Sequence, residues 1–115
     1  MGFLSSLFGS QVPTLSALEV NEKLKQAKRP FLLDVRQPEE FRSGHIAGAK
    51  LIPLGELNRR LGEVPKDREV VCICASGHRS VPAASTLIAA GYTASSLKNG
   101  MLAWQMARLP LNKGM

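Results

Sequence analysis

A cysteine stands at the point where a predicted strand gives way to a predicted helix. Residues 69–74 form a short apolar and β-branched run that ends at Cys74 and indicates a buried strand. Residues 81–90 carry no charge and are followed by Gly91, a pattern that indicates a buried helix with a glycine at its C-terminal end. We therefore expect the Cys74 thiol at the carboxyl end of a strand, facing the tight loop that leads into the helix.

The loop after this cysteine has the features of an anion-binding cradle. Its backbone N–H groups can turn inward and join the unpaired N–H groups that open the helix. Gly77 permits a positive φ or a close backbone approach, and Ser80 is a good helix N-cap. These N–H groups and the Arg79 guanidinium favour a thiolate, so we expect the pKa of Cys74 to lie below the value of about 8.5 of free cysteine. The predicted nucleophile is Cys74, and the predicted binding loop consists of Ala75, Ser76, Gly77, His78, Arg79 and Ser80.

The loop resembles the active-site loop of the rhodanese family, the single-domain sulfurtransferases. The family pattern Cys-x-x-Gly-x-Arg-Ser is met by Cys74, Gly77, Arg79 and Ser80. Other motifs follow the family's order: Asp34-Val-Arg36, Glu40-Phe41, Gly44-His-Ile-x-Gly-Ala49 with Ile52-Pro53, Gly91-Tyr92, and Leu97-x-x-Gly100 with Trp104. The resemblance covers residues 14–109. It implies a rhodanese-like α/β/α domain of three layers, and a polar network that supports the loop, formed by Asp34, Arg36 and Glu40.

The surrounding patterns alternate between strand and helix, which predicts a small parallel sheet with helices on both faces. Ser16 and Glu19 form a capping box, and Pro38 to Phe41 are interpreted as a turn. We expect strands over 31–35, 50–52, 70–74 and 92–97, and helices over 17–27, 54–61, 80–90 and from 101 until Pro110 closes the last one. Gly62 is expected to end the helix over 54–61. The strand 70–74 is the most continuously apolar and is placed at the centre, with ligands beyond its carboxyl end.

Length and charge constrain the organisation and the partners. The 115 residues suffice for one domain, which we place at 14–115 after a tail at 1–13. The net charge is +6, and no Asp or Glu occurs in residues 70–115, so we expect a small anionic sulfur donor as the partner. No run of Lys or Arg indicates a surface that binds nucleic acid.

The apolar start of the tail is too short for a transmembrane span, and we interpret it as a docking or weakly interfacial segment, or as disordered.

The remaining cysteine and the histidines are assigned to packing or left open. Cys72 shares a strand face with Cys74, and we treat it as a core residue although it is placed to act as a resolving thiol. Two cysteines in this spacing form neither a disulfide framework nor a zinc site, so we expect a reducing, cytoplasmic location with no metal and no cofactor. His45 is interpreted as a packing residue, Trp104 as a core anchor, and His78 as a residue that tunes substrate charge or is simply exposed.

Three functions, two of them catalytic, are compatible with a cysteine followed five residues later by an arginine. In sulfur transfer, Cys74 attacks a sulfane sulfur and becomes a persulfide held by the loop. In phosphate or arsenate ester chemistry the loop binds an oxyanion, but the related phosphatases have a loop one residue longer, and no acid follows Glu69 to protonate a leaving group. A non-catalytic sulfur-carrier or regulatory module is the third, although inactive family members typically lose the cysteine.

Sulfur transfer fits these residues best. We therefore predict a sulfurtransferase that moves sulfur from thiosulfate, a polysulfide or a persulfide to cyanide, a thiol or a protein. A papain-like hydrolase would need a helix-borne cysteine and an orienting Asn or Asp, for which the sequence offers no counterpart.

Overall fold

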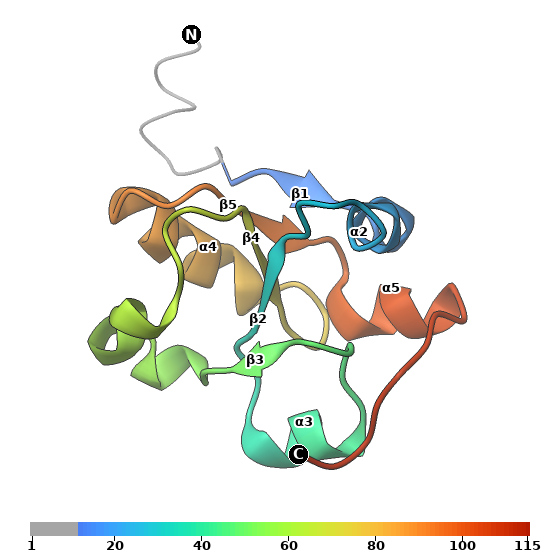
Figure 1. The fold of residues 1–115 in the computed structure, drawn as a ribbon. Coiled ribbons are helices and arrows are strands. Elements are labelled where there is room, and N and C mark those ends of the chain that lie inside the picture. Colours follow the sequence, from blue (N-terminus) through green and yellow to red (C-terminus); the bar gives the residue numbers. More distant parts are fainter. Residues whose placement is uncertain (1–11) are drawn as a thin grey trace, which may run out of the picture.

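The computed structural model describes residues 12–115 and shows a single parallel sheet (Figure 1). The interpretation of the apolar tail segment at 1–10 lies outside the described residues. Across the sheet the strands run in the order β1 (Thr14–Leu15), β5 (Ala94–Leu97), β4 (Val70–Ile73), β2 (Phe31–Asp34) and β3 (Lys50–Leu51). Each neighbouring pair is parallel. The predicted α/β fold, with β4 at the centre of the sheet, is confirmed.

Helices cover both faces of the sheet (Figure 1). They are α2 (Ala17–Lys23), α3 (Pro38–Ser43), the 3₁₀ helices η1 (Leu54–Glu56) and η2 (Asn58–Glu63), α4 (Ser80–Ala89) and α5 (Gly100–Met106). The side chains of β4 alternate between two cores: Val70 and Cys72 pack on the α4 side, and Val71 and Ile73 pack on the α2 and α5 side. All four are fully buried, which explains why this strand is apolar on both faces.

Two predicted helices in the N-terminal half differ from those in the structure. The capping box of Ser16 and Glu19 is present, but α2 ends at Lys23 instead of Ala27, and turns follow it. The segment predicted as an α-helix over 54–61 forms η1 and η2, and Gly62 lies inside η2 rather than ending it. Apolar residues spaced by three, as in 54 and 57, fit one turn of a 3₁₀ helix as well as they fit an α-helix. Sequence spacing alone therefore does not separate the two.

Two elements were not predicted. The turn expected at Pro38 is the first turn of α3, where proline fits position N1 and the Glu40 side chain accepts a hydrogen bond from the Gln37 N–H. Acidic residues in that first turn complete an ordinary helix start. The other missed element is β1, whose two residues pair with Ser96 and Leu97 at the edge of the sheet. A strand of this length has too few residues to show a period.

The C-terminal half follows the prediction with shifted ends. β5 begins at Ala94 rather than at residue 92, and α5 ends at Met106, before Pro110. Gly91 has a φ of 93° just after α4, as a C-terminal glycine should. Trp104 is buried at 1% exposure and donates from Nε1 to the Pro110 carbonyl, so its predicted role as a core anchor is confirmed. Within residues 12–115, no helix is long and apolar enough to cross a membrane.

Candidate active site

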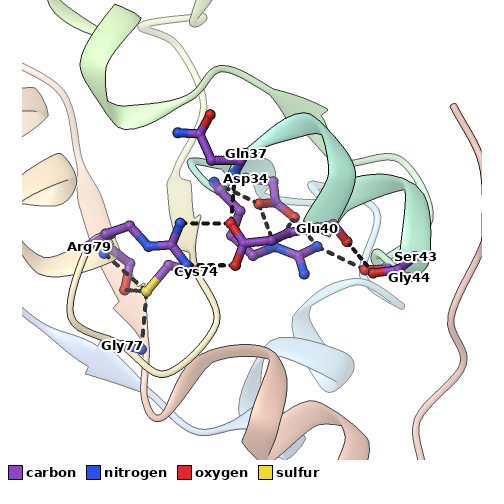
Figure 2. Close-up of polar contacts among 10 residues, drawn as sticks. Asp34, Gln37, Glu40, Ser43, Gly44, Cys74, Gly77 and Arg79 are labelled. Atoms are coloured by element: carbon purple, nitrogen blue, oxygen red, sulfur yellow. Dashed lines mark hydrogen bonds and ion pairs between the residues drawn. The ribbon is translucent and has the colours of Figure 1, made fainter.

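The Cys74 sulfur lies at the carboxyl end of β4 and is surrounded by hydrogen-bond donors of the following loop (Figure 2). The Gly77 N–H donates to Sγ over 3.0 Å, and the Ser80 N–H donates over 3.3 Å. The Ser80 hydroxyl oxygen is also 3.3 Å from Sγ. Because a tight loop connects strand and helix, its N–H groups converge on one point, and that point is the sulfur.

These contacts lower the pKa of Cys74 in spite of burial. Burial of the thiol by itself would raise its pKa, because it disfavours the charged form. The Ser80 hydroxyl and the N–H groups of Ser80, Gly77 and Arg79 act in the opposite direction and prevail, so the pKa lies below the usual value. The thiolate is thus stabilised mainly by neutral donors. The sequence argument had also counted on the charge of the Arg79 guanidinium, which has another partner.

The Arg79 side chain forms a two-pronged ion pair with Glu40 of α3 (Figure 2). Nη1 and Nη2 each lie 2.8 Å from a different carboxylate oxygen. The hydrogen bonds from Arg79 outweigh partial burial and lower the pKa of Glu40 to about 2. The pair connects the loop to α3, although the two residues are 39 positions apart in the sequence. Two parallel N–H···O bonds between a guanidinium and a carboxylate fix the relative orientation of both groups, so the pair holds the loop in position.

Asp34 and Arg36 form a second, buried ion pair at the end of β2. Arg36 donates from Nε and Nη2 to the Asp34 carboxylate, at 2.9 and 2.8 Å, and from Nη2 to the Gly44 carbonyl at 2.8 Å. Asp34 is 0% exposed and Arg36 4%. Arg36 also contributes to the lowered pKa of Glu40 by its charge. Of the three residues expected to support the loop, Glu40 is bonded directly to Arg79, whereas Asp34 and Arg36 are bonded to each other and Arg36 acts on Glu40 by its charge.

Ser80 does not act as the predicted N-cap. Arg79 occupies the cap position, and Ser80 is the first residue of α4. Its hydroxyl points to Cys74 Sγ and to the Ser96 hydroxyl, 2.7 Å away. Gly77 behaves as predicted, with a φ of 99°, and a Cβ there would lie 3.2 Å from the Asn99 nitrogen. Conformation and space both demand glycine at this position.

Comparison with known proteins agrees with this geometry. The family model described as Rhodanese-like domain matches residues 16–107. The chain belongs to the rhodanese-like domain family. A sulfurtransferase of Allochromatium vinosum is 34% identical over 101 residues, which are 87% of this chain and 94% of that protein. An HTH-type transcriptional regulator of Mycobacterium tuberculosis is 35% identical over 112 residues, 96% of this chain but only 49% of the regulator.

Solved structures of rhodanese-like proteins have the same fold. A rhodanese-related protein of Thermoplasma volcanium superposes with a TM-score of 0.81 at 29% identity, over 87% of this chain and 97% of that chain.

The other candidate residues of this rhodanese-like domain have separate roles. Cys72 is buried in the core beneath α4, and burial, with the neighbouring Cys74 charge, raises its pKa to about 12. His45 is buried and stacks on Phe41 with ring centroids 3.8 Å apart, and its Nδ1–H donates to the Phe41 carbonyl oxygen over 2.8 Å, as expected of a packing residue. His78 is exposed, and its Nδ1 lies 2.9 Å from Ser76 Oγ. Ala75 lies in the loop, partly exposed.

A pocket of about 190 Å³ adjoins the rhodanese-like loop. Sequence reasoning missed the residues on its far side, which come from β1, β5 and the turn before α5. The lining consists of Thr14, Ser96, Lys98 and Asn99 facing Ser76, Gly77, His78 and Val81. The signal available in the sequence was the position of Ser96 and Lys98 at the carboxyl end of a strand next to β4. A larger cavity of about 310 Å³ lies where β2 begins and includes no residue of the loop.

Proposed function

We propose that this rhodanese-like domain is a sulfurtransferase that acts through a persulfide on Cys74. The observation that carries the proposal is the convergence of the Gly77 and Ser80 N–H groups and the Ser80 hydroxyl on a single sulfur. Such a cradle favours the thiolate, which is the nucleophilic form. The same donors can stabilise the negative charge of a persulfide formed there.

The reaction needs no general acid or base from the protein once the thiol is ionised. The Cys74 thiolate attacks the outer sulfur of thiosulfate, a polysulfide or a persulfide and forms a new S–S bond. The old S–S bond breaks, and its electron pair leaves with sulfite or with the donor's thiolate. An acceptor thiolate or cyanide then attacks the outer sulfur of the persulfide and restores the Cys74 thiolate. The electropositive half of the chain suits an anionic donor.

Ester hydrolysis fits the site less well. A phosphatase loop of this kind would use the arginine to hold phosphate oxygens, whereas both terminal nitrogens of Arg79 are bound to Glu40. Glu40 and Asp34 are each paired with an arginine, so neither is placed to protonate a leaving group.

The test is the intact mass of the protein after incubation with thiosulfate or a polysulfide. We expect one added sulfur atom on the wild type and on Cys72→Ala, which removes the buried thiol without introducing a polar group, and none on Cys74→Ser. Cyanide should then remove the sulfur and yield thiocyanate over repeated cycles. If no sulfane donor produces an adduct, or if phosphate esters are hydrolysed instead, the proposal is wrong.

A sulfur-carrier or regulatory module is the second candidate, because the regulator of Mycobacterium tuberculosis matches this chain over only half of its own length. Such a module would form the Cys74 persulfide but would release its sulfur only to a dedicated protein acceptor. A Cys74 persulfide that forms with a sulfane donor but is not removed by cyanide would favour this second candidate.

A further inference from the structure

Two serine hydroxyls form a chain from the Cys74 sulfur to the pocket beside the loop. Ser80 Oγ lies 3.3 Å from Cys74 Sγ and 2.7 Å from Ser96 Oγ. Ser80 is 0% exposed and Ser96 1%, so bulk water does not compete for these hydrogen bonds. Ser96 belongs to the lining of the 190 Å³ pocket, whereas Cys74 does not. The chain therefore runs from a shielded sulfur to a residue of the pocket lining.

No basic side chain of the loop is hydrogen-bonded to the Cys74 thiol. Cys74 is 0% exposed in the protein without a bound donor, so its thiol proton is not in contact with bulk solvent. Over residues 12–115, no carboxylate or imidazole is hydrogen-bonded to the sulfur; its partners are the Gly77 N–H and the N–H and hydroxyl of Ser80. A thiol that must ionise before it attacks needs another route for its proton.

We propose that Ser96 is a positioning residue for Cys74: through Ser80 it orients the hydroxyl that stabilises the thiolate and provides the path by which the thiol proton reaches the pocket. The proposal rests on the proposed function in one respect, the role of Cys74 as nucleophile. In the thiol form, the sulfur donates to Ser80 Oγ, and the Ser80 hydroxyl donates to Ser96 Oγ.

Ionisation reverses both hydrogen bonds. The proton of Sγ moves to Ser80 Oγ, the former Ser80 proton moves to Ser96 Oγ, and the former Ser96 proton moves to a water molecule in the pocket. The sulfur keeps the electron pair and gains one negative charge, and each serine remains a neutral hydroxyl. Ser80 now donates to the thiolate, and Ser96 donates to Ser80. The final arrangement is the one that stabilises the charge.

The neighbouring Ser95 supplies a matched control. Ser96 pairs with Cys72 in the sheet register and bonds to Ser80 of α4, whereas Ser95 pairs with Val71, which faces the opposite core. Ser95 is also buried, at 5% exposure, and its hydroxyl oxygen has no hydrogen-bond partner among the described residues. The two serines thus share chemistry, strand and burial and differ in their connection to the sulfur.

The experiment measures the pKa of Cys74 from the ultraviolet absorbance of the thiolate, between about pH 5 and pH 9, in full-length variants. We expect Ser96→Ala to raise this pKa by about 0.5 to 1, as the loss of one supporting hydrogen bond implies. Ser95→Ala and Ser96→Thr, which retains the hydroxyl, should titrate as the wild type does. Ser80→Ala should raise the pKa, and adding Ser96→Ala to it should have no further effect, because the connecting hydroxyl is then absent.

The proposal is overturned if the pKa of Cys74 in Ser96→Ala equals the wild-type value. It is also overturned if Ser96→Ala raises the pKa of Cys74 by the same amount in the Ser80→Ala protein as in the wild type. Circular dichroism establishes that each variant is folded, and Ser96→Val, which has the shape of Ser96→Thr without the hydroxyl, replaces Ser96→Ala if the latter is not folded. The titration requires no sulfur donor, so it is independent of the proposed function. Failure to form a persulfide would refute sulfur transfer while leaving the measured effect of Ser96 on the thiolate in place.

Discussion

The ion pair between Glu40 and Arg79 gives a quantitative prediction for Glu40→Gln. The substitution removes the charge but keeps an oxygen that can accept from the Gln37 N–H, so it isolates the contact with the loop. The pKa of Glu40 falls from 4.5 to about 2 in the folded protein, which would correspond to about 3 kcal/mol for a fully buried group. The side chains of Arg79 and Glu40 are 34% and 32% exposed, so solvent screening reduces the expected loss to about 1 to 2 kcal/mol.

The pH dependence of that loss follows from the direction of the shift. A carboxylate whose pKa is lower in the folded state stabilises the protein above its unfolded pKa, and this contribution disappears as the pH falls through the folded pKa. The difference in unfolding free energy between wild type and Glu40→Gln should therefore be complete at neutral pH, fall to less than half by about pH 3 and vanish near pH 2. Urea unfolding at each pH measures it.

A second carboxylate provides the control for this experiment. The pKa of Glu63 is also lowered to about 2, through hydrogen bonds from Arg60, but Glu63 lies in η2 and makes no contact with the loop. We expect Glu40→Gln to slow alkylation of Cys74 or change its pH profile, and Glu63→Gln to leave both as in the wild type. Equal stability of Glu40→Gln and wild type at neutral pH, or a difference that does not change down to pH 3, would refute this reasoning.

Three other substitutions test separate contacts. Arg79→Lys loses one of two hydrogen bonds to Glu40, so we expect a loss of about 1 kcal/mol in unfolding free energy and persulfide formation slower by about fivefold; equal rates would show that charge alone is needed. Gly100→Ala would place a Cβ against the Cys74 carbonyl oxygen and the Ala75 backbone at a φ of +57°, so thermal unfolding should reveal a loss of at least about 2 kcal/mol. Gly55→Ala is the control and should be neutral, because no atom of the described residues lies within 4 Å of the added Cβ. Ser95→Ala removes a buried hydroxyl that has no hydrogen-bond partner within residues 12–115, and urea unfolding should show a gain of about 1 kcal/mol in unfolding free energy.

The sequence predicted the elements whose signals are local and long enough to repeat. The central strand β4 is apolar at every position because both of its faces are buried, and α4 is bounded by a loop and by Gly91. Such patterns identify a strand and a helix without knowledge of their neighbours. The two-residue strand β1 and the helix α3 escaped detection because one has no period and the other begins with a proline that also suits a turn.

The parts of the site that were missed depend on contacts between distant residues. Glu40 was placed near the loop by family resemblance, but its two-pronged bond to Arg79 joins residues that are 39 positions apart. Ser80 was assigned to helix capping because serine favours that position, yet its hydroxyl is held by Cys74 and Ser96. A short polar side chain has several suitable hydrogen-bond partners, and tertiary contacts decide which one it takes. Those contacts involve residues that are distant in the sequence, so local patterns do not predict the partner.

The origin of the lowered pKa of Cys74 determines which residues control it. A guanidinium that is neutralised by Glu40 exerts little net charge on the sulfur, whereas N–H dipoles at 3.0 and 3.3 Å act only when the loop has the correct shape. That shape depends on Gly77, with its positive φ, and on Gly100, which lies against the backbone of Cys74 and Ala75. Reactivity of the thiol is therefore expected to follow loop geometry more closely than the net charge around it. Substitutions of these glycines should raise the pKa of Cys74 without any change in the charge of the protein.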